Sequence, residues 1–183
     1  MWTLFLITQS RLTNIPLFLI FTLQFHLLDL LQLSPNEVSI TSLLLQYFSF
    51  FAFGGSNAIS SIDLSSAYNG ISDYNVAAVG VLTFVSNWAG PIWWVSTTTL
   101  KLIRFHRAGH KNVLGRHLRI LSLFAATSLL FVMIACTALR AHLFIWTVFS
   151  PKYLYSMAWT LAQHLCVNIL CVVLIFSIGI IGV

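Results

Sequence analysis

The stretch 118-LRILSLFAATSLLFVMIACTAL-139 decides the fold class, because it contains a single charged residue, Arg119. A helix that crosses the hydrocarbon of a bilayer needs roughly 20 consecutive, mostly apolar residues. The apolar character here is continuous, whereas strands of a membrane barrel alternate apolar and polar positions. Backbone amides in lipid must also pair within their own segment. The stretch therefore predicts a transmembrane helix.

The rest of the chain has the same character. Of its 183 residues, 58% are hydrophobic and only 7% are charged, against about 25% charged residues in a typical soluble domain. We therefore predict an all-α fold, a polytopic transmembrane helical bundle that forms a single membrane domain over residues 1–183. Residues 1–10 look like the end of a further span. About five spans are expected: Ile15 to Leu33, Pro35 to Phe53, Tyr74 to Phe105 with an interruption at Gly90-Pro91, Leu118 to Leu139, and Pro151 to Ile181.

Positive charge gathers between the third and the fourth of these spans. Such clustering is typical of a cytosolic loop, and binding of lipid phosphate is the alternative interpretation. The net charge of +5 therefore does not indicate nucleic acid as a partner. With the loop 106–117 in the cytosol, the polar segment 56–73 and the turn 140–152 fall on the opposite side of the membrane. Six of the nine basic residues lie in this stretch: Lys101, Arg104, Arg107, Lys111, Arg116 and Arg119.

Local signals mark where the helices begin, end and break. Ser34 is expected to cap the second span, with Pro35 in its first turn and Gly54-Gly55 after its end. Pro91 has no N–H, so the third span is expected to kink or break near it. The flanking tryptophans serve either as interfacial anchors or as the wall of a lipid-facing cleft.

Four spans each carry a stripe of polar residues, and polar groups at membrane depth cost free energy unless they are paired. The stripes are therefore expected to face one another or a shared cavity. Three interpretations remain open: hydrogen bonds that hold the bundle together, a groove for a lipid headgroup, or a path for ions or protons. The stripes are Thr22, His26 and Asp29; Ser39, Ser42, Gln46 and Ser49; Gly80, Thr83, Asn87 and Gly90; and Ser156, Thr160, His164 and Asn168.

Two long motifs bear a family resemblance. The segment FFAFGGSNAISSIDLSSAYNGISDYNVAAVGVLTFVSNWAGPIWW (50–94) resembles the late membrane region of the glycosylphosphatidylinositol (GPI) ethanolamine phosphate transferases. Within that family it looks most like the type that modifies the second mannose. The segment LRAHLFIWTVFSPKYLY (139–155) resembles a C-terminal signature that this type shares with the third-mannose enzyme.

The resemblance implies an endoplasmic reticulum enzyme of GPI-anchor biosynthesis. Such an enzyme moves ethanolamine phosphate from phosphatidylethanolamine to a mannose hydroxyl of the GPI precursor. In the family, the chemistry belongs to a lumenal domain like alkaline phosphatase, with two zinc ions. That domain has no counterpart in this sequence, so no catalytic residue, metal site or cofactor is expected here. We interpret the chain as a C-terminal membrane module: a fragment, a truncated gene product or one part of a split protein.

The resemblance leaves open whether the chain alone is an enzyme. Its expected partners are membrane lipids, namely phosphatidylethanolamine and the GPI precursor, together with a small hydrophobic partner subunit of the Pig-F type. A non-catalytic scaffold that docks this subunit is the alternative function. An independent transporter or channel is a third candidate, which the few charges within the spans disfavour.

The polar lumenal segment and the turn 140–152 supply the candidate site residues. One interpretation is a loop folded over the bundle, in which Asp63 and Asp73 pair with Arg140 or Lys152. The sharper hypothesis is a rim at which lipid substrate passes to the catalytic domain, with the two basic residues holding phosphate. The candidates for this groove are Asn57, Asp63, Tyr68, Asn69, Asn87, Arg140, His142 and Lys152.

Overall fold

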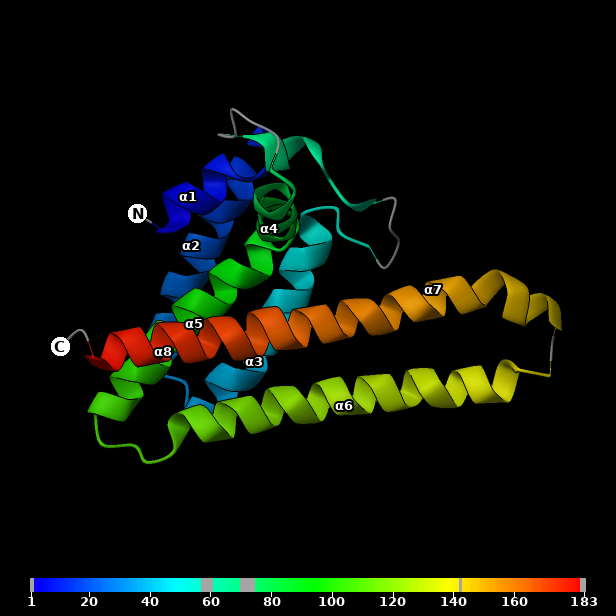
Figure 1. Ribbon diagram of the computed structural model, residues 1–183. Helices are drawn as coiled ribbons and strands as arrows, with labels where there is room; N and C mark the ends of the chain where they lie inside the picture. Colours follow the sequence, from blue (N-terminus) through cyan, green and yellow to red (C-terminus); the bar gives the residue numbers. More distant parts are fainter. Residues whose placement is uncertain (1, 57–60, 70–74, 142, 182–183) are drawn as a thin grey trace.

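The computed structural model describes residues 2–56, 61–69, 75–141 and 143–181 (Figure 1), without the side chains of Ala67 and residues 143–152. All regular elements within these ranges are helical. The α-helices are α1 (Trp2–Thr8), α2 (Ile15–Leu30), α3 (Pro35–Ala52), α4 (Val76–Asn87), α5 (Ala89–Arg107), α6 (Val113–Leu139), α7 (Leu143–Ala162) and α8 (Val172–Ile181). The shorter or irregular helices are η1 (Leu12–Asn14), η3 (Ser65–Tyr68) and the π-helix η4 (Gln163–Cys171).

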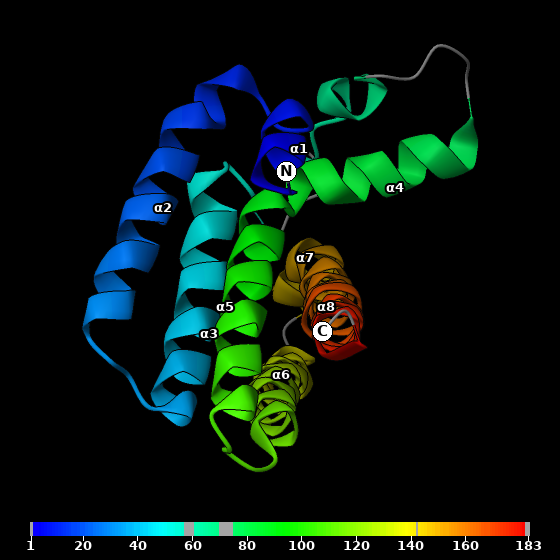
Figure 2. The ribbon, with the colours of Figure 1, turned by 90° about the vertical axis from the view of Figure 1, so that its left-hand side faces the viewer.

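Helices α2, α3 and α5 run alongside one another and form the body of the bundle (Figure 2). Large aromatic side chains join α2 to the other two helices. The ring of Phe21 lies 5.8 Å from the rings of both Trp93 and Trp94 and 5.9 Å from that of Phe53. The rings of Phe21, Trp93 and Trp94 are buried together with Phe18, and the partly buried Phe53 packs against them, so the core of the body is mainly aromatic.

The ends of α3 follow the sequence signals. Ser34 caps the helix in a capping box: its hydroxyl accepts from the N–H of Glu37, and its own N–H donates to the Glu37 carboxylate. Pro35 occupies the first turn, where a missing N–H costs nothing. After the helix ends, Gly54 has a φ of +82°, a conformation that favours glycine. The predicted start and stop of this helix are confirmed.

The third predicted span is bent by 74° between α4 and α5. The break falls at Trp88, slightly before the predicted interruption at Gly90-Pro91. Pro91 lies in the first turn of α5, where its ring is tolerated. Gly90 permits the close approach of α3, because a Cβ at this position would lie 2.9 Å from the Cβ of Ser49.

The number of spans is lower than the five that the sequence predicts. Within the described ranges, three segments are long and apolar enough to cross a membrane, or four if the bent pair counts as one. Helix α3 is not among them, because its polar residues lower its mean hydropathy. These polar residues are buried inside the bundle. The prediction of an all-α membrane bundle is confirmed. The three segments are Leu12–Leu30, Val113–Leu139 and Tyr153–Ile181.

Helices α6 and α7 form a long hairpin that extends beyond the body (Figure 1). The sequence predicts a turn over 140–152, but from Leu143 onward the chain belongs to α7. This helix continues through η4 into α8, which packs against α5.

Candidate functional site

A polar cluster centred on Asp63 lies beyond the N-terminal end of α2. Its carboxylate accepts hydrogen bonds from Arg11 Nε at 2.7 Å, from the Ser65 hydroxyl at 2.7 Å and from the Ser66 hydroxyl at 3.0 Å. The backbone N–H of Ser65 donates to it as well, at 3.1 Å. These donors satisfy the charged form of the carboxylate, so the cluster is closed.

The electrostatics of the cluster favour an ionised Asp63. The hydrogen bond from Arg11 is the largest cause that holds the pKa of Asp63 well below its ordinary value, and those from Ser65 and Ser66 act in the same direction. Partial burial opposes them, because it disfavours the charged form. Asp63 therefore remains a carboxylate and an acceptor throughout the physiological pH range.

Asn87 fixes the backbone of Asp63 from the end of α4. Its amide oxygen accepts from the Asp63 N–H at 2.9 Å, and its amide nitrogen donates to the Asp63 carbonyl at 3.0 Å. The same nitrogen donates to the carbonyl of Thr83 at 2.8 Å. The break before α5 thus places Asn87 where its side chain holds the segment 61–69 against the end of α4. This is the geometry expected for a loop that is folded over the bundle.

Arg11, rather than Arg140, is the partner of Asp63. Arg140 is exposed and follows α6, at the far end of the hairpin from the Asp63 cluster (Figure 1). A salt bridge between Asp63 and Arg140 was expected because both were placed on one side of the membrane. That expectation is wrong, because the length of the α6–α7 hairpin carries its turn away from the cluster.

The remaining groove candidates have different positions. Tyr68 is 51% exposed, and the Asn69 amide donates to the carbonyl of Thr8 at 3.2 Å. Asn69 therefore ties the segment to α1. Asn57, Asp73 and His142 lie outside the described residues, and Lys152 lies in α7 without a described side chain.

The polar stripe of α3 forms hydrogen bonds with three other helices. Thr98 of α5 donates to Ser42 at 2.9 Å, and Gln163 of η4 donates to the amide oxygen of Gln46 at 3.1 Å. The ring nitrogen Nδ1 of His117, in α6, lies 2.9 Å from the Ser39 hydroxyl. These contacts support the interpretation that the α3 stripe holds the bundle together.

The other intramembrane candidates are not joined into a path. Asp29 pairs with Lys101 at 3.1 Å rather than with His26. His164 Nε2 lies 3.2 Å from the Ser122 hydroxyl. Asn168 is buried, and within the described residues its amide oxygen has no hydrogen-bond partner. The predicted residues at membrane depth therefore form separate contacts.

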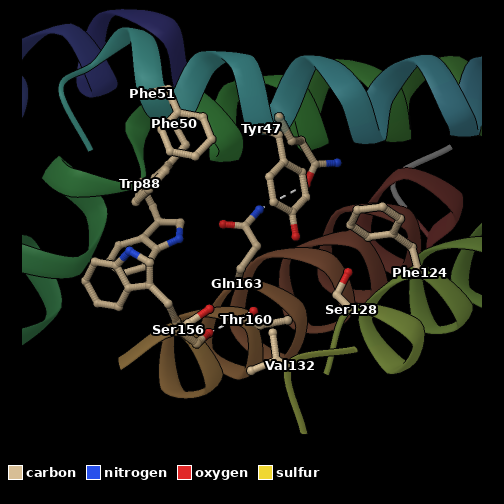
Figure 3. Close-up of a pocket in the computed structure, with 12 residues that line it drawn as sticks. Tyr47, Phe50, Phe51, Trp88, Phe124, Ser128, Val132, Ser156, Thr160 and Gln163 are labelled. Atoms are coloured by element: carbon tan, nitrogen blue, oxygen red, sulfur yellow. Dashed lines mark hydrogen bonds between the residues drawn. The ribbon is translucent and has the colours of Figure 1, made fainter. Parts of the chain in front are cut away.

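A cleft of about 190 Å³ lies between α3, α6 and the α7–η4 helix (Figure 3). Phe50 and Trp88 gather at one end of it, Tyr47 and Phe124 at the other, and Gln163 lies between the two ends. Its lining consists of Gln46, Tyr47, Phe50, Phe51, Trp88, Phe124, Ser128, Val132, Ser156, Trp159, Thr160 and Gln163. Gln46 also lines the cleft, so the hydrogen-bonded pair of glutamines belongs to its wall.

The lining gives this cleft an amphipathic character. An apolar cavity of about 150 Å³ is large enough to hold benzene, so the cleft admits a ring or a short length of lipid chain. Trp159 lies 4.3 Å from Trp88 between ring centroids, and within the described residues its buried indole N–H has no partner. The hydroxyls of Ser128, Ser156 and Thr160 offer further polar contacts. The cleft can therefore bind a molecule with both apolar and hydroxyl-bearing parts.

The sequence predictions found only part of this cleft. Of the four stripes that were expected to face one another or a shared cavity, two contribute to this cleft, through Gln46 of the second predicted span and through Ser156 and Thr160 of the fifth. The aromatic residues of the wall were missed, as was Arg11 in the Asp63 cluster. A usable signal was the spacing of Ser156, Trp159, Thr160 and Gln163, which places all four on one helix face.

Metal chemistry has no evident place in the described part of the chain. There, no three His, Cys, Asp or Glu side chains come close enough together to hold a metal ion. The three cysteines are free and form no disulfide. What the described residues offer is binding of apolar and polar groups.

Comparison with known proteins gives a consistent result. Residues 1–180 match the family model described as the GPI ethanolamine phosphate transferase membrane region. The chain is 56% identical over 168 residues to GPI ethanolamine phosphate transferase 2 of Aspergillus oryzae, covering 92% of this chain and 19% of the relative. It is 58% identical over 163 residues to the protein of the same name from Aspergillus fumigatus, covering 87% and 20%.

A more distant relative agrees. GPI ethanolamine phosphate transferase 2 of Kluyveromyces lactis is 42% identical over 179 residues, which cover 97% of this chain and 19% of the relative. No solved structure matches the chain. The chain thus spans about a fifth of the length of the curated relatives that it matches. On this evidence, the chain belongs to the GPI ethanolamine phosphate transferase family and corresponds to its membrane region.

Proposed function

We propose that this chain is the lipid-handling membrane part of an enzyme that transfers ethanolamine phosphate from phosphatidylethanolamine to the second mannose of a GPI precursor. The relatives named GPI ethanolamine phosphate transferase 2 support the reaction. The match to the family's membrane region supports a role in binding lipid rather than in the transfer step itself. In this proposal, bond-making belongs to a zinc-dependent lumenal domain elsewhere in the protein, and the membrane is that of the endoplasmic reticulum.

The single observation that carries the lipid-handling role is the cleft between α3, α6 and the α7–η4 helix. A GPI precursor combines acyl chains with hydroxyl-rich sugars, and the cleft combines aromatic rings with amides and hydroxyls. Aromatic rings bury a large apolar area while the neighbouring polar groups fix orientation. The π-helix that begins at Gln163 adds an irregularity of a kind that often accompanies functional sites.

The proposal predicts that filling the cleft removes activity. Ser128 lies in the wall, whereas Leu130 of the same helix is 55% exposed and outside the wall. In the full-length enzyme, Ser128→Phe should lower transferase activity roughly tenfold or more, which corresponds to at least about 1.4 kcal/mol of lost binding. The matched control Leu130→Phe should retain activity. Full activity of Ser128→Phe at normal protein level would contradict the proposal.

A second candidate function is a scaffold that docks a small hydrophobic subunit of the Pig-F type. The observation that favours it is the α6–α7 hairpin, which extends beyond the body and exposes Phe131, Ile134 and Leu154. Replacing these three residues with alanine should release such a subunit in co-purification if it docks here. Retention of the subunit would assign its contact to another surface.

A further inference from the structure

A second cavity lies at the opposite end of α2 from the Asp63 cluster. It has a volume of about 270 Å³ and lies where the turn after α2 meets the last turns of α5. Its lining consists of Asp29, Gln32, Leu33, Lys101, Arg104 and Phe105. Charged groups and apolar side chains thus share one cavity, which the transferase assignment does not use.

Lys101 is held in place at this cavity. Its ammonium group lies 3.1 Å from Asp29 Oδ1 and 5.2 Å from the centroid of the Phe25 ring. The Lys101 side chain is only 12% exposed, whereas that of Asp29 is 48% exposed. The ammonium is therefore positioned at the cavity by a carboxylate and a ring face.

Arg104 supplies charge that nothing in the described structure balances. It is exposed in the last turn of α5, and within the described residues it makes no ion pair. Two cations and one carboxylate leave the cavity with one net positive charge, which matches the single negative charge of a phosphodiester. A guanidinium also presents donors in a geometry suited to phosphate oxygens.

The position of the cavity identifies the source of the phosphate. It opens at the end of the bundle that carries Arg107 and Lys111, where positive charge marks the boundary between hydrocarbon and water. Leu33 and Phe105 extend the cavity with apolar surface. A phosphate with attached acyl chains satisfies both parts of the lining, whereas free phosphate satisfies only the charged part.

We propose that this cavity binds the phosphodiester headgroup of a membrane glycerophospholipid. Arg104 and Lys101 contact the phosphate oxygens, and the acyl chains leave along Leu33 and Phe105. Asp29 limits the affinity, because it competes with the phosphate for Lys101. The site shares no lining residue with the cleft of Figure 3, and its existence does not depend on the proposed transferase function.

The test measures lipid retention by the full-length protein. The protein is purified in detergent, titrated with dioleoylphosphatidylcholine or with phosphate-free dioleoylglycerol, and examined by native mass spectrometry. Arg104→Gln should weaken phosphatidylcholine binding roughly tenfold, as expected for the loss of a charge-assisted hydrogen bond. Arg119→Gln is the matched control, because its guanidinium is exposed on α6 and bonds the carbonyl of Gly115. The Arg119→Gln variant should bind phosphatidylcholine as tightly as the unchanged protein does.

A second variant makes the test two-sided. Asp29→Asn should strengthen phosphatidylcholine binding, because it frees Lys101 while leaving the cavity its shape. Equal retention by Arg104→Gln and the unchanged protein would overturn the proposal, as would weaker binding by Asp29→Asn. Inorganic phosphate that displaces the lipid at equal concentration, or dioleoylglycerol that binds equally well, would also overturn it.

Discussion

Two ion pairs lie near opposite ends of α2 and use the same chemistry differently. Near its N-terminal end, the side chain of Asp63 is 17% exposed, and its carboxylate accepts hydrogen bonds from Ser65 and Ser66 as well as from Arg11, whose own side chain is 57% exposed. Near its C-terminal end, Asp29 is 48% exposed and pairs with Lys101 beside an open cavity. We call the first pair closed, because hydrogen-bond donors of the protein surround its carboxylate, and the second pair open, because it borders a cavity. A closed pair stabilises the fold, whereas an open pair can still bind a ligand.

The largest difference in stability is expected between variants that remove one or the other of the two carboxylates, Asp63 and Asp29. Asp63→Ala removes four hydrogen bonds and should lower the stability of the cluster by about 2–4 kcal/mol. Asp29→Ala should change stability by less than about 1 kcal/mol, as for other partly exposed ion pairs. Hydrogen exchange of 61–69 and of 26–33, compared in both variants, measures the two effects. Equal losses would remove the distinction between a closed and an open pair.

The next largest effect is expected in the body of the bundle, where α5 packs closely on α3 at Gly90. Gly90→Ala would bring a Cβ to 2.9 Å from that of Ser49, and such overpacking should cost about 1–3 kcal/mol. Gly80→Ala is the matched control, because a Cβ there meets nothing within 4 Å. Gly80→Ala should raise the free energy of unfolding by up to about 1 kcal/mol, because alanine favours the helix. Thermal unfolding in detergent compares the two, and equal midpoints would contradict the packing.

Acid should weaken the closed cluster progressively. The folded pKa of Asp63 lies below its ordinary value, so its stabilising effect is complete above about pH 4 and is lost as the pH falls further. Protection of 61–69, corrected for intrinsic exchange rates, should fall below that pH in the unchanged protein. In Asp63→Asn the additional loss should be absent. A parallel decline in both proteins would assign the acid sensitivity to other groups.

The smallest effect is expected at Arg140, which the sequence suggested as a partner of Asp63 but which lies far from it in the structure. Arg140 is exposed at the far end of the hairpin, so Arg140→Gln should leave protection of 61–69 unchanged. Arg11→Gln should lower it by up to about 1 kcal/mol, because the Arg11 side chain is 57% exposed and solvent screens an exposed ion pair. If the two arginine variants had equal effects, the assignment of Arg11 as the partner would be contradicted.

Local signals predicted much of the fold and less of the site. The capping residues of α3 and the apolar run of α6 depend on nearby residues, so the sequence alone was sufficient. The partner of Asp63 depends on how the residues after α1 meet the segment 61–69, and Arg11 is 52 residues away along the chain. The cleft arises where a hairpin leaves the body, which no periodicity within one helix encodes. Polar stripes identified part of one wall, and helical spacing could have added Trp159 to it, whereas the aromatic residues from the other helices required the tertiary structure.

The central claim is that the cleft between α3, α6 and the α7–η4 helix handles the lipid substrate. The most direct measurement places a photo-crosslinking amino acid at Ser128 or, as the control, at Leu130 of the full-length enzyme in membranes. The account predicts that position 128 captures a mannose-bearing lipid and that position 130 captures only bulk phospholipid. An active enzyme that yields no mannose-bearing adduct at position 128 would contradict it.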